Sequence, residues 1–467
     1  MALEHFDVLI IGAGLSGVDA AHHLQKYCPH KSYAILDQRE QIGGTWDLFR
    51  YPGVRSDSDM FTMSFSFRPW TSPKAISPGE AIREYVTATA QEAGIDRHIR
   101  FRHEIKSAAW SSHSAQWEVN AVRKLPGGGE ESVTLTCNFL FSCAGYYRYS
   151  AGYLPEFPDI QRFKGPLIHP QAWPEGLDYS GKRVVVIGSG ATAVTLLPSL
   201  AKTASHVIML QRSPTYVVSL PGQDRIANWL RGVLPPMWAY RISRLKNVAF
   251  MLYFYQLAQH FPNFVKTGII KKVSEAVGPN CDVATNFTPR YNPWQQRLCL
   301  VPDGDMFKAI KAGRASVVTG QIQTFTEKGV QLESGETIEA DIVVTATGLA
   351  MQAFGGIELS VDGRSVDLSS TLAYRGVMIS GVPNLASVFG YINASWTLKA
   401  DLICAYVCRL LNFMDRKGVR QVTPQRRNET AAAPFVENFT SGYMQRSLAS
   451  AEAGFEAAVA RLSELHP

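Results

Sequence analysis

Two glycine-rich turns carry the residues of this sequence whose types and spacing are best suited to chemistry. The first turn, GAGLSG, has glycines at the GxGxxG spacing, and the apolar run SYAIL after it ends at Asp37. Glycines let the backbone approach a pyrophosphate, and a carboxylate placed after the next strand can accept hydrogen bonds from a ribose. The pattern predicts a dinucleotide site whose fingerprint positions are Gly12, Gly14 and Gly17.

The second turn lies in KRVVVIGSGATA and differs from the first in one residue that follows it. Its next apolar run, HVIML, ends in Gln211 and Arg212, so the position held by Asp37 in the first unit has no acid here. A carboxylate would repel a 2′-phosphate, whereas Arg212 can pair with it, although an ordinary exposed arginine at a strand end is the alternative. We therefore expect FAD at the first turn and NADPH at the second, whose fingerprint positions are Gly188, Gly190 and Ala193.

Each turn must be positioned by a strand before it and a helix after it, and the sequence has that order twice. Two further apolar runs, FLFSCAG and DIVVTATG, close on a small residue and glycine and bracket the second unit. We expect an α/β fold with two Rossmann-like dinucleotide-binding domains of the three-layer ββα type. The expected parts are a first FAD-binding segment over 1–147, an interdomain linker over 148–180, an NADPH-binding domain over 181–340 with a helical insert at about 222–280, and a second FAD-binding segment with C-terminal helices over 341–467.

Composition is that of a soluble globular protein, with 46% hydrophobic and 18% charged residues. The seven cysteines are scattered without a CxxC pair or a nearby histidine at ligand spacing, so we expect reduced thiols and no metal site. No export signal is visible, which favours the cytoplasm. The net charge of +6 is mild, and we expect no nucleic-acid partner.

The positive charge is concentrated between Arg225 and Ser274, where eight Arg or Lys residues occur without any Asp or Glu. A basic, aromatic-rich helical stretch of this kind can lie on an anionic membrane as a peripheral contact. The alternative, which we favour, is a helical insert packed against its own domain.

Two longer patterns give the sequence a family resemblance. GGTWDLFRYPGVRSD has the fixed positions Gly43, Gly44, Trp46, Tyr51, Pro52, Gly53 and Asp57, and FKGPLIHPQAWP has Phe163, Gly165, His169, Trp173 and Pro174. With the two nucleotide turns in the same order, the sequence resembles the type I Baeyer–Villiger monooxygenases, a family of class B flavoprotein monooxygenases, from its start to about Gly348. It looks most like the subgroup of the ethionamide-activating monooxygenase.

The resemblance implies that NADPH reduces FAD, that O₂ then forms a C4a-peroxyflavin, and that one oxygen atom enters a ketone to give an ester or lactone. Thioethers are the second implied substrate class. It also implies cofactor contacts by Gly44, Thr45, Trp46 and Asp57. A flavin-containing N- or S-monooxygenase that acts on soft nucleophiles remains the alternative function. A redox-inactive flavoprotein is a third, whereas a flavin disulfide reductase is excluded because no redox-active cysteine pair is present.

The resemblance also assigns a catalytic cation, Arg297, with Asp57 as its ion-pair partner. A fixed guanidinium can stabilise negative charge in the transition state, while a structural salt bridge and a turn-capping carboxylate are the alternative readings. Gln296 stands where many relatives have a lysine that reaches the NADPH phosphate, so the preference for NADPH depends more heavily on Arg212.

Three other segments complete the predictions. The linker residues His169 and Trp173 could change partners as the domains rotate, and so time hydride delivery. NASWTLKADL predicts a helix from about Ala394, capped by Asn393 or Ser395, in which Trp396 is either a wall of the substrate pocket or a core residue. The Ala/Glu-rich helix predicted near the C-terminus receives no function.

Overall fold

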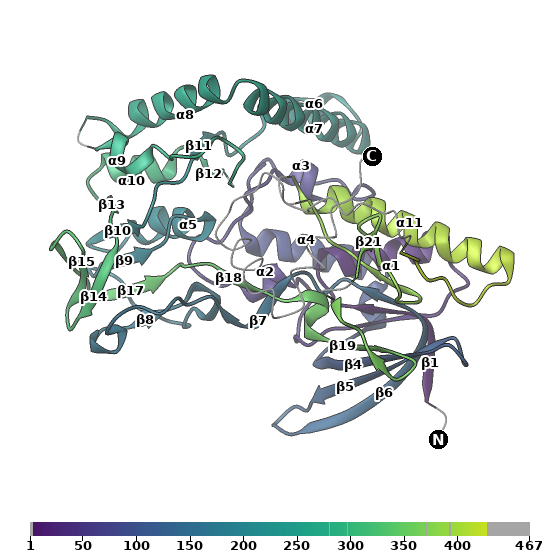
Figure 1. Ribbon diagram of the computed structural model, residues 1–467. Coiled ribbons are helices and arrows are strands. Elements are labelled where there is room, and N and C mark those ends of the chain that lie inside the picture. The colour runs from purple at the N-terminus through teal and green to yellow at the C-terminus, as the bar shows by residue number, and fades with distance from the viewer. Residues whose placement is uncertain (1–2, 280, 297, 369–370, 392–393, 427–467) are drawn as a thin grey trace.

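The computed structural model describes residues 3–279, 281–296, 298–368, 371–391 and 394–426 (Figure 1). Three of the predictions therefore lie outside the described residues: the catalytic Arg297, the candidate cap Asn393 and the C-terminal helix. The described residues form two large β-sheets, each covered by helices on one face. On the other face, the first sheet packs against its own antiparallel strands, and the second packs against a separate three-stranded antiparallel sheet.

The first sheet has nine strands and contains the first glycine turn. Its central strand alternates between two cores: Val8 and Ile10 pack with the helices, and Leu9 and Ile11 pack with Trp117 on the opposite face. The helices are α1 (Leu15–Tyr27), α4 (Gly79–Glu92) and α11 (Trp396–Lys417). The strands are β1 (Glu4–Ile11), β2 (Tyr33–Leu36), β3 (Ile99–Arg100), β4 (His103–Ser111), β5 (Gln116–Lys124), β6 (Glu130–Ser142), β19 (Glu358–Val361), β20 (Arg364–Ser365) and β23 (Leu385–Ser387).

The second sheet has five parallel strands and repeats this layering. Val184 and Val186 face a helical core, whereas Val185 and Ile187 face Phe325 of a three-stranded antiparallel layer. The sheet contains β13 (Ala315–Thr319), β10 (His206–Gln211), β9 (Arg183–Ile187), β17 (Ile342–Thr345) and β8 (Leu167–Ile168). The covering elements are α5 (Ala191–Leu200), α10 (Asp305–Lys311), β14 (Ile322–Thr326), β15 (Gly329–Leu332) and β16 (Thr337–Glu339).

The α/β fold with two Rossmann-like units of three layers is thus confirmed. Strands β7 (Tyr147–Gly152) and β18 (Leu349–Met351) pair antiparallel where the chain leaves the first unit and returns to it. The predicted linker contains a short strand, because β8 joins the edge of the second sheet beside β17. The division of the chain into domains at 147, 180 and 340 stays a prediction.

Three helices occupy the range predicted for the insert: α6 (Arg225–Val233), α7 (Pro236–His260) and α8 (Pro262–Val277). They form an outer layer along the top edge of the molecule in Figure 1. Tyr240 of α7 belongs to the core of the first unit, whereas Val265 of α8 belongs to the core of the second, so the insert packs on both. Among the described helices, none combines the length and the apolar character needed to cross a bilayer.

The remaining elements are short connections between these layers. They are α2 (Thr45–Leu48), α3 (Met60–Met63), α9 (Val283–Phe287), η1 (Ile95–His98), η2 (Ile160–Arg162), η3 (Pro170–Ala172), η4 (Ala353–Gly356), β11 (Val217–Leu220), β12 (Cys299–Pro302), β21 (Ala373–Tyr374) and β22 (Met378–Ile379).

Candidate active site

A cavity of about 340 Å³ lies where the first glycine turn, the fingerprint loop after α2 and the start of α5 meet. Thr192 and Thr195 of α5 contribute from the second unit, so the cavity spans both. Eight residues predicted for the site lie in its wall: Gly12, Gly14, Asp37, Gly44, Thr45, Trp46, Asp57 and Trp396.

The first glycine turn is closely packed. Gly12 has φ of +96°, and a Cβ there would lie 2.8 Å from the carbonyl oxygen of Cys143. A Cβ at Gly17 would lie only 1.9 Å from the carbonyl oxygen of Gly12, which no side chain could tolerate without a backbone shift. Gly14 caps α1 without a side chain, leaving the helix N-terminus exposed to the cavity. These features fit a pyrophosphate held by backbone N–H groups, as FAD would present it.

Asp37 at the end of β2 is buried, with 6% of its surface exposed. Its Oδ2 accepts a hydrogen bond from the Ala13 backbone at 2.6 Å, and its Oδ1 accepts one from the Arg39 backbone at 2.8 Å. Burial raises the pKa of Asp37, while these two N–H groups and the Arg39 guanidinium oppose the rise. The carboxylate is therefore fixed at the cavity wall, and its contact with a ribose stays a prediction.

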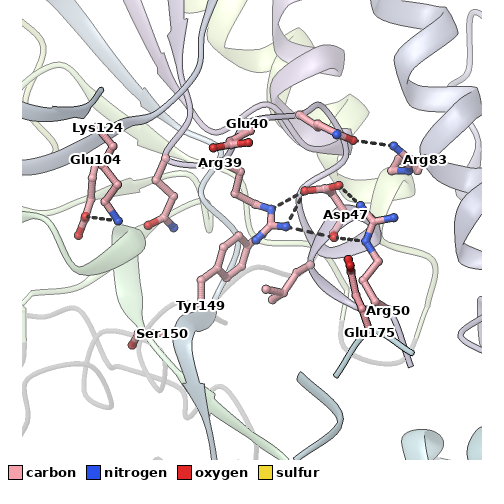
Figure 2. Close-up of a pocket in the computed structure, with 13 residues that line it drawn as sticks. Arg39, Glu40, Asp47, Arg50, Arg83, Glu104, Lys124, Tyr149, Ser150 and Glu175 are labelled. Carbon is pink, nitrogen blue, oxygen red and sulfur yellow. Dashed lines mark hydrogen bonds and ion pairs between the residues drawn. The ribbon is translucent and has the colours of Figure 1, made fainter. Parts of the chain in front are cut away.

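A second, wider cavity of about 820 Å³ adjoins the first, because Gln38, Glu104 and Tyr149 line both. Figure 2 shows the buried Asp47 carboxylate between the guanidinium groups of Arg39 and Arg50. Asp47 belongs to α2, so this pairing fixes the helix that carries Thr45 and Trp46. The sequence analysis missed this network, although Arg39 follows Asp37 by only two residues.

The loop after α2 crosses to the second unit. A Cβ at Gly53 would lie 2.0 Å from Ser199 Oγ, so the loop runs directly against α5. Arg55 forms an ion pair with Asp305 at the start of α10, with one N–H···O distance of 3.3 Å. Burial raises the pKa of Tyr51 to about 12, against a hydrogen bond with Thr192. No sequence signal pointed to Asp305, because the pair joins distant segments.

Asp57 lies in the cavity wall, as predicted. Its pairing with Arg297 stays a prediction, since that arginine is outside the described residues. Gln296 is described and forms an isolated β-bridge with Pro293 in the same segment.

The turn of the second unit is more open than the first. Gly188 has φ of +134° and its Cβ would lie 2.3 Å from the Ala346 carbonyl oxygen, but a Cβ at Gly190 would meet nothing within 4 Å among the described atoms. Gln211 is buried and donates to the carbonyl oxygen of Asn286 at 2.8 Å. Arg212 is exposed and has no acidic partner within 4 Å in the described part of the chain. It is thus free of competing ion pairs, as a phosphate-binding arginine should be.

The linker residue His169 contacts the end of β7 and the residue that precedes β18. Its Nε2 lies 3.1 Å from the carbonyl oxygen of Gly348, and its Nδ1 accepts a hydrogen bond from the Gln171 backbone at 3.2 Å. A Cβ at Gly152 would lie 1.9 Å from the ring. The burial of His169 lowers its pKa, which favours the neutral imidazole.

The other linker residues have packing roles. Phe163 is buried beside Phe325, and Trp173 packs edge-on against Tyr179. Gly165 is needed for close approach rather than a left-handed turn, since its Cβ would lie 2.5 Å from the Asp341 carbonyl oxygen.

The start of α11 completes the cavity. Trp396 Nε1 donates to Ser16 Oγ at 2.7 Å, and its ring stacks on Tyr146 with centroids 5.3 Å apart. Trp396 therefore lines the cavity and also packs against the core, and its place in a substrate pocket stays a prediction. Ser395 caps the helix only through its backbone, because its hydroxyl contacts Thr62 Oγ1 at 2.6 Å. Tyr146 was missed, although it directly follows the CAG strand end.

Comparison with known proteins relates most of the chain to flavoprotein monooxygenases, as the sequence motifs do. The model of the flavin-binding monooxygenase-like family matches residues 6–378. The chain is 54% identical over 447 residues to the FAD-containing monooxygenase EthA of Mycobacterium tuberculosis, covering 95% of this chain and 90% of that protein.

Two solved structures are similar in fold. A steroid monooxygenase bound to NADP has a TM-score of 0.76 at 21% identity, with 98% of this chain and 94% of that one covered. An epsilon-caprolactone-bound cyclohexanone monooxygenase has a TM-score of 0.74 at 22% identity, with 98% and 95% covered. At these identities the two structures support the fold alone.

Proposed function

The chain belongs to the flavin-binding monooxygenase-like family, and on that premise we propose that it is an FAD-dependent, NADPH-consuming monooxygenase. It inserts one oxygen atom of O₂ into ketones to give esters or lactones. The other oxygen atom leaves as water, and NADPH supplies the two electrons. The observation that supports this most is the shared cavity, whose wall combines the first glycine turn, Asp57 and Thr192 of the second unit.

Bound FAD would supply the exchange of electrons with NADPH and O₂, and the chain supplies binding, orientation and exclusion of water. The N-terminus of α1 would hold the pyrophosphate of FAD, and Asp37 would accept hydrogen bonds from the ribose of its adenosine half. Trp396 and Tyr146 form an aromatic wall of the cavity. Asp57 would orient the guanidinium of Arg297 toward developing negative charge.

Product analysis tests the reaction. The purified holoenzyme, given NADPH, a linear ketone and ¹⁸O₂, should form an ester that carries one labelled oxygen, detected by mass spectrometry. Arg297→Ala should keep its bound FAD and lose ester formation. An active Arg297→Ala variant would contradict the assigned role, and NADPH consumption that never responds to any ketone would contradict the ketone reaction itself.

We propose thioethers as a second substrate class, because the related EthA is an FAD-containing monooxygenase of the subgroup the sequence resembles. Sulfur is a soft nucleophile and does not need the stabilisation of a tetrahedral oxyanion. Arg297→Ala should therefore lower sulfoxide formation much less than ester formation. Sulfoxide without ester from the unaltered enzyme would instead favour an N- or S-oxygenating enzyme.

We also propose that the outer surface of α6, α7 and α8 docks on an anionic membrane. Trp238, Ile242, Leu245 and Leu252 recur on one side of α7 and are each at least 43% exposed. The exposed large apolar residues of these helices and of the turn between α7 and α8, called the apolar face below, are Ile226, Trp229, Val233, Trp238, Ile242, Leu245, Phe250, Leu252, Tyr253, Phe261 and Phe264.

Charge argues for a membrane as the occupant of the apolar face. Arg225, Arg241, Lys271 and Lys272 are exposed on the same helices, and the sequence from 225 to 274 has no acid. At the margins, Asp224 pairs with Lys246, and Glu275 is exposed near the end of α8. Basic residues beside exposed aromatic residues complement anionic headgroups and the apolar boundary beneath them.

Co-sedimentation with vesicles tests this surface. The full chain should bind mixed phosphatidylglycerol–phosphatidylcholine vesicles and not phosphatidylcholine alone. Leu245→Glu with Phe264→Glu should weaken binding by about tenfold or more, whereas Leu402→Glu, equally exposed on α11, should not. Unchanged binding by the double variant, a dimer that the same substitutions dissociate, or binding that appears only after removal of residues 427–467 would each reject the proposal.

A further inference from the structure

Three side chains outside the cavity converge between α1 and α11. Donor atoms of Asp19, His23 and Asp401 all lie within 4.8 Å of one another. His23 Nε2 is 3.6 Å from Asp19 Oδ1 and 3.0 Å from Asp401 Oδ1. Asp19 and His23 are four residues apart on one helix and therefore share a face. We propose that these three residues bind a divalent cation, with Zn²⁺ as the best match, and that the ion ties α1 to α11.

The state of Asp19 points to a ligand. Its side chain is 1% exposed, and no N–H or O–H group donates to either carboxylate oxygen within the described residues; the weak thiol donor of Cys404 is its one neighbouring donor there. A buried carboxylate with so weak a donor is costly, and Asp401 beside it adds like-charge repulsion. A cation between the two carboxylates would relieve both penalties.

The surrounding groups are consistent with this arrangement. Burial and then Asp401 raise the pKa of Asp19 well above its ordinary value, while the Cys404 thiol and Arg244 lower it. Arg244 donates to the carbonyl oxygens of Phe61, Thr62 and Ser64, so its own hydrogen bonds are made elsewhere. Its charge acts on the group only from a distance.

The donor set favours zinc. One imidazole nitrogen and two carboxylate oxygens are common zinc ligands, and three protein ligands leave one coordination position for water. Ser66 Oγ donates to Asp401 Oδ1 at 2.8 Å, which orients that carboxylate as outer-sphere hydrogen bonds do in metal sites. The sequence predicted no metal site because its cysteines have no partner at metal-ligand spacing. In the folded chain, α11 brings Asp401 next to Asp19 and His23 of α1, which are far from it in the sequence.

The position of the site gives it a structural role. The N-terminus of α1 faces the cavity, and Ser16 of α1 accepts a hydrogen bond from Trp396 at the start of α11. An ion bound farther along both helices would fix the same pair of elements. The site can be tested without an assay of the proposed reaction, because the measured quantities are metal content and protein stability.

Metal analysis tests the site in the full-length holoenzyme. We expect about one Zn²⁺ per chain after dialysis, and Co²⁺ added to the chelator-treated protein should give the visible absorption bands of a low-symmetry site. Asp19→Asn and His23→Gln should each weaken Co²⁺ binding by about tenfold or more. The matched control is His30→Gln, because His30 lies just after the end of α1 and pairs with Asp415 of α11 at the surface, where Lys31 already supplies a cation.

The bound FAD content shows whether each variant is folded, and Asp401→Asn replaces any variant that is not. Metal binding that the three variants retain would overturn the proposal. A second result would also overturn it: the original chain binds no metal and gives no cobalt spectrum, and Asp19→Asn is more stable than the original chain. That combination would mean that a proton on Asp19, and no metal ion, neutralises the group.

Discussion

The two dinucleotide units share one layout but differ in how tightly their glycine turns are enclosed. At Gly17 of the first unit a Cβ would lie 1.9 Å from a backbone oxygen, whereas the equivalent residue of the second unit, Ala193, already carries a methyl group and is fully buried. A Cβ at Gly14 would be 3.5 Å from Gly44, while the space around Gly190 is open within the described structure. Within the described residues, another segment closes over Gly14 of the first turn, whereas none lies against Gly190 of the second.

The residues that would contact the ribose differ in the same way. Asp37 is buried and held by two backbone N–H groups, whereas Arg212 is exposed and pairs with no acid of the described chain. A fixed, enclosed wall suits a cofactor that stays bound through many turnovers. An open turn with an exposed cation suits one that must arrive and leave in each cycle.

Adding one methyl group to each turn should separate the units most strongly. Gly17→Ala should destabilise the holoenzyme by about 3 kcal/mol or more and empty the flavin site, because the clash is with backbone. Gly190→Ala is the matched control, since its φ of −78° suits alanine. The flavin-to-protein absorbance ratio and thermal unfolding measure both effects. Equal losses from the two substitutions would remove the distinction between a closed and an open turn.

Removing the second unit's cation should change cofactor choice by a smaller amount. Arg212→Ala should raise the Michaelis constant for NADPH by about tenfold or more, since a charge-assisted pair with the 2′-phosphate contributes about 1.5–3 kcal/mol. The constant for NADH should change little. Equal effects on NADPH and NADH would show that Arg212 does not read the phosphate.

Residue 296 allows the opposite substitution, in which a cation is added instead of removed. Gln296→Lys should lower the Michaelis constant for NADPH in the Arg212→Ala background, because a lysine there restores a cation near the phosphate. An unchanged constant would mean that residue 296 does not reach the cofactor.

The features of the two units that could be predicted from the sequence are those set by local patterns. The strand expected before the first glycine turn is observed as β1 over Glu4–Ile11, and both glycine turns lie between a strand and a helix. Such segments are set by neighbouring residues: an apolar run, a glycine spacing and a helix start. The difference between Asp37 and Arg212 was equally local.

Contacts between distant segments were not visible. Arg55 and Asp305 are 250 residues apart, and nothing near either one specifies the other. Ser395, one of two candidate caps, is the N-cap residue of α11, but its hydroxyl contacts Thr62 instead of the helix backbone, because tertiary packing offered it a closer partner. The two-residue strand β8 is too short to have a period and exists only because β17 lies beside it. Arg297 was reached by family resemblance, and its role stays a prediction.

The link between the units should affect timing more than binding. His169→Ala removes a side chain that contacts Gly348, which precedes β18, and Gly152 of β7. We expect turnover to slow or more NADPH to be lost as hydrogen peroxide, each by a few-fold, with the flavin content unchanged. His206→Ala is the control, since its imidazole bonds Ser316 at 2.9 Å within the second sheet. An unaltered rate and coupling ratio in His169→Ala would leave the linker without a timing role.

The smallest expected effect is the pH dependence of that same contact. In the folded chain Nδ1 of His169 accepts a hydrogen bond from the Gln171 backbone, which only an unprotonated Nδ1 can do. Because burial lowers the folded pKa below the ordinary value of 6.5, the neutral ring stabilises the fold above pH 6.5, and this contribution is lost as pH falls through the lowered pKa.

The stability difference between the original chain and His169→Gln should therefore be greatest above pH 7 and shrink below pH 6.5. We expect it to stay under about 1 kcal/mol, since the ring is only half-buried and solvent screens its charge. Chemical unfolding at a series of pH values measures it. A stability difference that grows as pH falls would mean that the folded chain holds His169 as the cation. The contact between the two units would then depend on the charge of the ring, and the hydrogen bond of a neutral ring would not explain it.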